Sequence, residues 1–357
     1  MKPATENTLN HWLNRTTQNL APGSFAVVMA TGAIALSAKI LGFIPLSNVL
    51  LWVNIVIYIF LWIVLIMRAY KFPRNLSDDF RDLGRGTGFL TIVAGSAILG
   101  SQFVLLDHQA IIGIIFLGVS GILWLLLNYG LFFSFITKIN KSSFETEISG
   151  TWLLITVAIQ SISALLSVLQ AQNILPYCSC FNFISFSLWL LGDVFYIVII
   201  LLILYRMIFF KLSAQDLMPP YWINMGAASI STLAGALLVS CTKDSLFLHD
   251  LIPFIKGFTL LFWTTATWWI PLLFILGWWR FIVHKINFSY DSSYWGMVFP
   301  LGMYSLCTLH LEKSFSLSFL FLLAYIFFFI ALTAWTVTML AFLHKTYVNF
   351  LQIEYIG

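Results

Sequence analysis

Residues 222–234 read WINMGAASISTLA, an aromatic residue followed by a run of small residues. An aromatic residue followed by small or aliphatic ones occurs four more times, in FAVVMATGAIALS (25–37), FLTIVAGSAILGS (89–101), WLLITVAIQSISA (152–164) and WGMVFPLGMYSLC (295–307). The leading aromatic residues are separated by 64, 63, 70 and 73 residues, about the length of two membrane helices with their connections. This spacing predicts an internal repeat of helical hairpins.

Between these segments lie five others that are rich in Leu, Ile, Phe and Trp, such as VLLWVNIVIYIFLWIVLIM (49–67) and FLFLLAYIFFFIALTAWTV (319–337). Small residues let membrane helices pack closely, whereas bulky apolar side chains suit a surface that faces lipid. We therefore predict an all-α integral membrane protein with ten transmembrane helices. They form five helical-hairpin repeats around a central pore, with the small-residue helices as the inner ring.

The composition supports a membrane protein, because 60% of the 357 residues are hydrophobic and only 9% are charged. A soluble domain averages about 25% charged residues. The sequence predicts ten spans, at residues 22–41, 48–68, 87–106, 110–134, 148–170, 184–207, 220–241, 252–279, 292–309 and 316–343. They form one membrane domain over residues 22–345, between tails at 1–21 and 346–357. The first span matches the repeat, so we interpret it as retained rather than as a cleaved signal peptide.

The 18 Lys and Arg residues set the expected orientation, because basic residues gather in cytoplasmic loops. One set of connections holds only Lys39, Lys243, Lys256 and Lys313, and the tails and remaining connections hold the rest. We therefore expect both termini in the cytoplasm and the chain in the cell's inner or plasma membrane. The net charge of +4 then reflects topology and does not indicate a nucleic-acid partner.

The predicted inner wall carries no Asp, Glu, Lys or Arg from each leading aromatic residue to Ala38, Leu106, Gln170, Thr242 and Leu309, respectively. Cation channels usually have acidic rings, and proton pumps usually have a relay of ionisable groups. An uncharged passage still favours anions where helix dipoles and hydroxyls supply a weak positive potential. The candidate pore-lining residues are Phe25, Met29, Gly32, Phe89, Val93, Ser96, Trp152, Thr156, Gln160, Trp222, Asn224, Gly226 and Gly302.

One position in the repeat is an exception. Four residues after the leading aromatics stand Met29, Val93, Thr156, Gly226 and Phe299. Only the last is aromatic, and it is followed by Pro300, which lacks the N–H that would bond to the carbonyl of Gly296. We expect a kink in the ninth span near mid-membrane. Phe299 is either a packed core ring or a plug in a narrow pore.

Asp193 lies inside the sixth span, where an ionised carboxylate is costly without a partner. It is a candidate either for a contact between helices or for a site that couples transport to protons. Lys256 is a conceivable partner, although snorkelling to the membrane surface accounts for Lys256 more simply. Gln160 and Asn224 either line the pore or form hydrogen bonds between helices.

The sequence does not point to an enzyme or to a bound cofactor or metal. Its six histidines fall in tails, loops or helix ends without ligand spacing, and no GxxxxGK[ST] loop for ATP occurs. Cys178 and Cys180 are a weak metal signal. Spacing leaves open a disulfide among Cys178, Cys180 and Cys241, and unpaired thiols are the favoured interpretation.

Four blocks of the chain carry a family resemblance: LAPGSFAVVMATG (20–32), PPYWINMGAASISTLAG (219–235), KGFTLLFWTTATWWIPLL (256–273) and YWGMVFPLGMYSLCT (294–308). They are similar to the tellurite-resistance and dicarboxylate transporter family, which includes the slow-type anion channels of plant guard cells. The resemblance covers about residues 20–345. It implies five hairpins, a pore in each protomer of a trimer, and an occluding phenylalanine on the ninth helix. The matching position here is Phe299, followed by Pro300.

The resemblance leaves the cargo open, because members are associated with chloride, nitrate, sulfite, malate and other dicarboxylates, and with tellurite resistance. The leading hypothesis is a homotrimeric anion channel in which Phe299 occludes the axial pore of each protomer. The alternative is a proton-coupled carrier of four-carbon dicarboxylates such as malate or succinate, with Asp193 as the titrating group. A sensor or scaffold that moves nothing is a third hypothesis, without support from an extra soluble domain.

Overall fold

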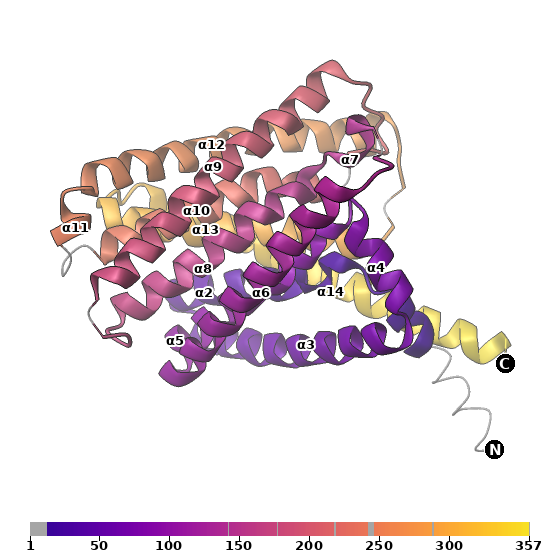
Figure 1. The fold of residues 1–357 in the computed structure, drawn as a ribbon, viewed down its shortest axis with the longest axis horizontal. Helices are drawn as coiled ribbons and strands as arrows, with labels where there is room; N and C mark the ends of the chain where they lie inside the picture. The colour runs from indigo at the N-terminus through magenta and orange to yellow at the C-terminus, as the bar shows by residue number, and fades with distance from the viewer. Residues whose placement is uncertain are drawn as a thin grey trace.

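The structure is a computed structural model that describes residues 13–141, 143–176, 178–217, 219–241, 246–287 and 289–356. Lys2, His11 and Lys243, and most of the predicted N-terminal tail, lie outside these residues. Every element that the structure describes is a helix, and the long helices lie side by side in one bundle (Figure 1). The prediction of an all-α membrane protein is confirmed, whereas the central pore stays a prediction.

Five of the long helices begin within two residues of a leading aromatic residue, and we call them the inner helices. They are α2 (Ala26–Ile40), α5 (Leu90–Leu106), α8 (Leu154–Ala171), α10 (Ile223–Ser240) and α13 (Trp295–Phe315). Each is followed by a longer helix rich in bulky residues, which we call an outer helix. The outer helices are α3 (Ile44–Lys71), α6 (Ala110–Thr137), α9 (Ser179–Phe209), α12 (Ile252–Trp278, continued by a π-helical turn at Trp279–Val283) and α14 (Leu320–Ile356).

The inner helices are buried and the outer helices are exposed, as the alternation of small and bulky segments predicts. In the spans that contain α2, α5, α8 and α10, between 78% and 94% of the most apolar stretch is buried, against 11% to 39% in the outer helices. Most residues of α13 are buried as well. Large apolar side chains such as Trp52, Ile122 and Leu322 are exposed, and lipid is their natural surrounding.

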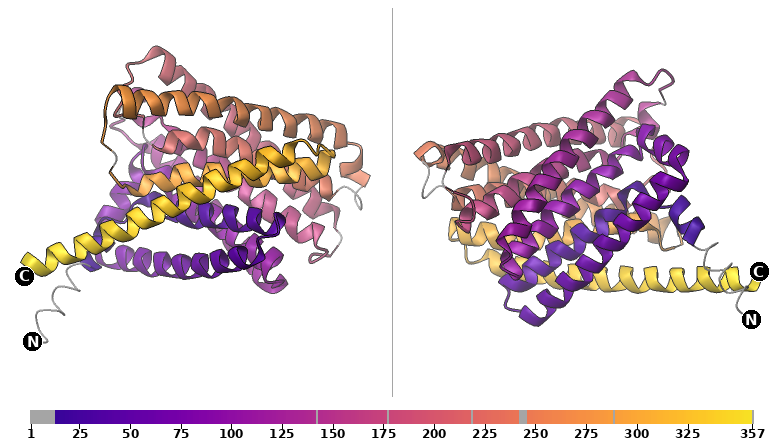
Figure 2. Two further views of the ribbon diagram at one scale, coloured as in Figure 1. Left: turned by 180° about the vertical axis from the view of Figure 1, so that it is seen from behind. Right: turned by 60° about the horizontal axis from the view of Figure 1, so that its bottom comes forward.

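The inner helices form a closed circuit. Each contacts the next inner helix along the chain, and α13 contacts α2. Each inner helix also packs against the outer helix that follows it. Figure 2 shows α14, in yellow, along the outside of the bundle with its C-terminal end projecting beyond the other helices.

A short 3-10 turn opens each inner helix, a feature that the sequence patterns did not predict. These turns are η1 (Pro22–Phe25), η2 (Gly86–Phe89), η3 (Gly150–Leu153), η4 (Pro219–Trp222) and η7 (Ser292–Tyr294). They contact one another in the same circular order as the inner helices. The N-terminal ends of all five inner helices therefore meet at one end of the bundle, which we call the turn end. The helices α4 (Pro73–Arg81) and α7 (Phe144–Glu147) lie at this end and α11 (Leu246–His249) at the opposite one (Figure 1).

Glycine permits the closest of these contacts between turns. A Cβ atom on Gly88 would lie 2.8 Å from the backbone nitrogen of Gly23, and one on Gly150 would collide with the carbonyl oxygen of Pro220. Real Cβ atoms do not approach backbone atoms so closely, so the backbones of these turns touch directly.

Nine helices in the described residues are long and apolar enough to cross a membrane. The tenth predicted span is α13, which has 21 residues but includes polar side chains such as His310 and Glu312. An inner helix is shielded from lipid by its neighbours, so it needs no continuous apolar surface.

Two predicted boundaries around α13 are wrong. The helix continues to Phe315, six residues beyond the predicted end of the ninth span, and α14 begins only at Leu320. Ser316 ends α13 with a left-handed φ of 57°, a conformation that terminates helices. His310 and Lys313 therefore lie on a helix and not in a loop. At the other end of the last span, α14 continues to Ile356, through most of the predicted C-terminal tail.

The expectation of unpaired thiols is wrong for the Cys-x-Cys pair. A disulfide joins Cys178 to Cys180, directly before and within the first turn of α9. The thiol of Cys241 instead donates to the backbone carbonyl of Ser167, 3.2 Å away, and so links the ends of α10 and α8.

Candidate functional site

Three of the candidate pore-lining residues are glycines, and all three lie where inner helices touch. A Cβ atom on Gly32 would collide with Ile98 of α5, and one on Gly302 would lie 2.9 Å from a side chain of α2. A Cβ atom on Gly226 of α10 would lie 2.6 Å from the ring of Pro300. Larger residues at these positions would push the inner helices apart, so the small residues keep the circuit tight.

The five leading aromatic residues pack against rings that lie outside the circuit of inner helices. The ring-to-ring distances are 5.8 Å for Phe25 to Tyr58, 5.7 Å for Phe89 to Phe80, 5.6 Å for Trp152 to Phe135, 5.3 Å for Trp222 to Phe274 and 6.5 Å for Trp295 to Trp335. The partner rings belong to α3, α4, α6, α12 and α14. These contacts fasten the start of each inner helix to its surroundings, and a lining role for the five aromatics stays a prediction.

The four polar candidates divide into two pairs. The Ser96 hydroxyl lies 2.8 Å from the hydroxyl of Tyr58 on α3, and Gln160 bonds to α9, so both side chains face outer helices. Thr156 and Asn224 are fully buried, and neither the Thr156 hydroxyl nor the Asn224 amide has a hydrogen-bond partner among the described residues. Buried polar groups nearly always have a partner. A lining role for Thr156 and Asn224 stays a prediction.

Phe299 lies deep in the protein, with 1% of its surface exposed. The residues at the equivalent places of α2, α5 and α8, Met29, Val93 and Thr156, are fully buried. The helix α13 runs unbroken across Pro300, and the Pro300 ring packs against Gly226 of α10. Pro300 is the sixth of the 21 residues of α13, so it lies in the half of the helix next to the turn end.

Asp193 of α9 faces the inner helices, where it is 1% exposed. The side-chain nitrogen of Gln160 on α8 donates to Asp193 Oδ1 at 2.8 Å and to the backbone carbonyl of Trp189 at 2.9 Å. Gly192 makes room for this bond, because a Cβ atom there would lie 2.6 Å from the Gln160 nitrogen. The carboxylate also interacts with the hydroxyl of Ser231 on α10, and it has no ion-pair partner among the described residues. Lys256 is not such a partner, since its ammonium lies 5.4 Å from the centre of the Phe315 ring.

The turn end contains a buried ion pair and an ionised carboxylate held by hydrogen bonds. Arg68 of α3 is buried and lies 2.6 Å from Asp79 of α4, whose other oxygen lies 3.0 Å from Arg85. In the loop before η4, the backbone N–H and hydroxyl of Ser213 donate to Asp216, and these bonds hold the pKa of Asp216 below its usual value. Asp216 therefore stays ionised at neutral pH.

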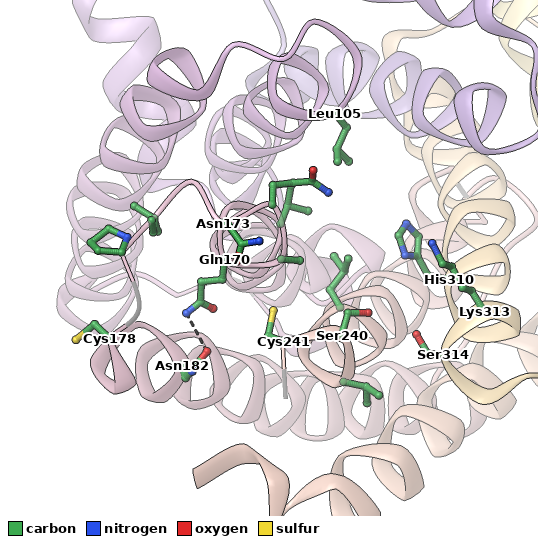
Figure 3. A pocket seen from close by; sticks show the side chains of 17 residues that line it. Leu105, Gln170, Asn173, Cys178, Asn182, Ser240, Cys241, His310, Lys313 and Ser314 are labelled. Carbon is green, nitrogen blue, oxygen red and sulfur yellow. Dashed lines mark hydrogen bonds between the residues drawn. The ribbon is translucent and has the colours of Figure 1, made fainter. Parts of the chain in front are cut away.

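A cavity of about 1000 Å³ lies at the opposite end of the bundle, which we call the cavity end (Figure 3). The C-terminal parts of α5, α8, α10 and α13 and the start of α9 line it. Its polar lining residues are Gln170, Gln172, Asn173, Asn182, Ser240, His310, Lys313 and Ser314. Hydropathy alone misses this cavity, because it assigns Lys313 to a connection. The three-residue spacing of His310 and Lys313, which places both on one face of a helix, is the signal that was available.

Comparisons with known proteins agree with the resemblance found in the sequence. A family model described as a voltage-dependent anion channel matches residues 19–343. Two uncharacterized transporters of Methanocaldococcus jannaschii are each 23% identical over 340 residues, which cover 92% of this chain and 96% and 94% of theirs. An uncharacterized membrane protein of Mycobacterium tuberculosis is 33% identical over 149 residues, which cover 42% of this chain and 75% of that protein. The match runs through all five inner and all five outer helices, so the chain belongs to the voltage-dependent anion channel family.

Proposed function

We propose that this protein transports small anions across the membrane through a passage enclosed by its five inner helices. The observation that supports this proposal is the closed circuit of five buried helices. These helices have no ionised side chain between the leading aromatics and the cavity end. The five helix N-termini meet at the turn end, and each carries about half a positive charge. An anion there meets weak attraction and no fixed charge strong enough to trap it, which conduction requires.

The Phe299 ring is the proposed occlusion of this passage. It is the one aromatic at its place in the repeat, it is buried, and the neighbouring Pro300 packs closely on α10. Asn224 and Thr156 lie two and four residues after their own leading aromatics, so they stand within about one helical turn of the Phe299 level. Their unpartnered polar groups would contact an anion that passes the ring.

Planar-bilayer recording of Phe299→Ala tests the occlusion. Removing a ring from the path widens it, so the anion current per protein should rise severalfold. The matched control is Phe262→Ala, which truncates an equally buried ring of the outer helix α12 that packs 5.3 Å from Tyr196. A current that is unchanged in Phe299→Ala, with the protein shown to be in the membrane, would overturn the occlusion.

A homotrimer with one passage in each protomer, and cytoplasmic termini in an inner or plasma membrane, complete the proposal. The exposed apolar faces of the outer helices offer surface both for lipid and for neighbouring protomers. Native mass spectrometry of the purified protein measures the oligomeric state, and a monomer or dimer would contradict the trimer. Labelling of single cysteines at the turn end, from inside and outside, measures the orientation.

Asp193 supports a second candidate, a proton-coupled carrier of four-carbon dicarboxylates such as malate or succinate. Its carboxylate lies on an outer helix and interacts with Gln160 and Ser231 of two inner helices, as a titrating group that couples helix positions would. Malate uptake into proteoliposomes should then require a pH gradient and fall in Asp193→Asn, whereas Asp107→Asn, at an exposed position after α5, should leave it unchanged. Uptake that responds to neither the gradient nor Asp193→Asn would remove this candidate.

A further inference from the structure

The cavity at the cavity end has a chemistry that the inner wall lacks. Figure 3 shows His310 and Lys313 side by side on α13, with amide and hydroxyl side chains of the neighbouring helices around the same space. Among the described residues that line it, Lys313 is the one Lys or Arg, and none is Asp or Glu. The side chains that line this cavity therefore carry a net positive charge at neutral pH.

An anion in this cavity needs the positive charge of Lys313, because the C-terminal ends of helices surround it. Four inner helices direct their C-terminal ends to the cavity, and each end carries about half a negative charge on its unbonded carbonyls. An anion would be repelled there unless a cation offsets the carbonyls. Lys313 lies in the last turn of α13, where its positive charge offsets part of this negative potential. The neighbouring Glu312 does not line the cavity, because adjacent residues on a helix point in different directions.

Hydrogen bonds of the lining residues fix the helix ends around the cavity. Ser240 of α10 and Ser314 of α13 both donate to the carbonyl of Ala236, at 3.3 and 3.2 Å, so the two helix ends are tied together. Gln170 of α8 donates to Asn182 of α9 at 2.9 Å across the wall. Lys313 is exposed and has no ion-pair partner in the described part of the chain. Its charge can therefore act on an anion in the cavity.

We infer that this cavity is an anion-collecting vestibule, in which Lys313 attracts small inorganic anions and carboxylates before they enter the passage. The inference rests on the proposed anion transport but not on the occlusion by Phe299. A volume of about 1000 Å³ is far larger than one such anion, so the anion keeps its water and is recognised by charge and not by fit. Chloride and malate should therefore both depend on Lys313.

The test measures flux of chloride and of malate into proteoliposomes as the anion concentration is varied, for Lys313→Gln, Lys313→Glu and Lys313→Arg. Loss of one charge within contact distance in water weakens attraction by roughly fivefold, so the concentration for half-maximal flux should rise about fivefold in Lys313→Gln. It should rise further in Lys313→Glu and stay unchanged in Lys313→Arg. Lys39→Gln is the matched control, because Lys39 lies in the last turn of α2 but does not line the cavity.

The outcomes separate this inference from the proposed function. If the wild-type protein moves neither anion, both the proposed function and the vestibule are contradicted. If the wild type moves anions and the half-maximal concentration is the same in Lys313→Glu, only the vestibule is overturned. A lower maximal flux without a change in the half-maximal concentration overturns it too, since it indicates a structural role for Lys313. In planar bilayers, the effect should be confined to anions added on the cavity side.

Discussion

The turn end and the cavity end of the bundle are built from the same five helices, yet they differ in packing and in charge. At the turn end the 3-10 turns touch through Gly88 and Gly150, and the buried Arg68 is paired with Asp79. At the cavity end four of the same helices separate around about 1000 Å³, and Lys313 has no ion-pair partner among the described residues.

The two ends differ because helix N-termini and helix C-termini have opposite electrostatic potentials. Helix N-termini supply positive potential from the backbone itself, so an anion pathway at the turn end needs no basic side chain in its wall and the turns can pack tightly. Helix C-termini supply negative potential, so an anion pathway that opens there needs a basic side chain and space for a hydrated ion. On this interpretation, substitutions at the turn end act mainly on stability and passage, and substitutions at the cavity end act mainly on capture.

The largest effect is expected for Asp79→Ala, which would leave Arg68 buried and unpaired. Removing one partner of a buried ion pair costs about 3 to 5 kcal/mol of stability, because the remaining charge is uncompensated. The change in unfolding free energy can be measured by denaturant titration in detergent, with the exposed neighbour Asp78→Ala as the control. Equal stability of the two variants would show that the ion pair does not hold the turn end together.

A smaller loss is expected for Gly150→Ala, because the added Cβ atom collides with the carbonyl of Pro220 in the neighbouring turn. Forcing one carbon into a tight contact typically costs about 1 to 3 kcal/mol. Gly23→Ala is the control in another of the five turns, since a Cβ atom there meets nothing within 4 Å. The thermal midpoints of both variants give the comparison. A midpoint for Gly150→Ala as high as that of the control would mean that the turns are packed loosely.

The smallest effect on stability is expected for Thr156→Val, which replaces an unpartnered buried hydroxyl with a methyl group of similar size. Stability should stay within about 1 kcal/mol of the wild type or rise, while anion flux should fall because a polar contact is lost from the passage. Thr91→Val is the control, because the Thr91 hydroxyl bonds to the carbonyl of Gly88 at 2.7 Å. That variant should lose about 1 kcal/mol and keep its flux. The reverse pattern would place Thr156 outside the passage.

The alternation of small and bulky segments predicts most of the fold, because hydropathy and residue size report directly on burial in a membrane. The same reasoning misplaces the end of α13, where His310 and Lys313 are polar enough to resemble a connection but lie on the helix. It also misses the five 3-10 turns, whose hydrogen-bond pattern leaves no periodic signal in four residues. The sequence therefore predicted which segments are buried. It did not predict where α13 ends or that 3-10 turns open the inner helices.

For the candidate site, the sequence predicted which polar residues lie on the inner helices. It did not predict which neighbouring helix each side chain faces. The sequence identified Ser96, Thr156, Gln160 and Asn224 as polar residues on inner helices, but only packing decides which face of a helix points to which neighbour. Ser96 and Gln160 meet outer helices, and Gln160 thereby becomes the partner of Asp193. Lys256, weighed as that partner, lies against Phe315 instead.

The sequence by itself determined that this chain is a membrane protein of alternating buried and exposed helices, and that its small-residue segments carry no Asp, Glu, Lys or Arg. It also determined that Phe299 is the one aromatic among the five matching positions. These properties depend on composition and spacing, which survive any rotation of the helices. Only the tertiary structure decided that the helix N-termini meet in a ring of turns, that Asp193 binds Gln160, and that Lys313 lines an open cavity. Those properties depend on contacts between residues far apart in the chain, and a contact exists only once the helices have packed.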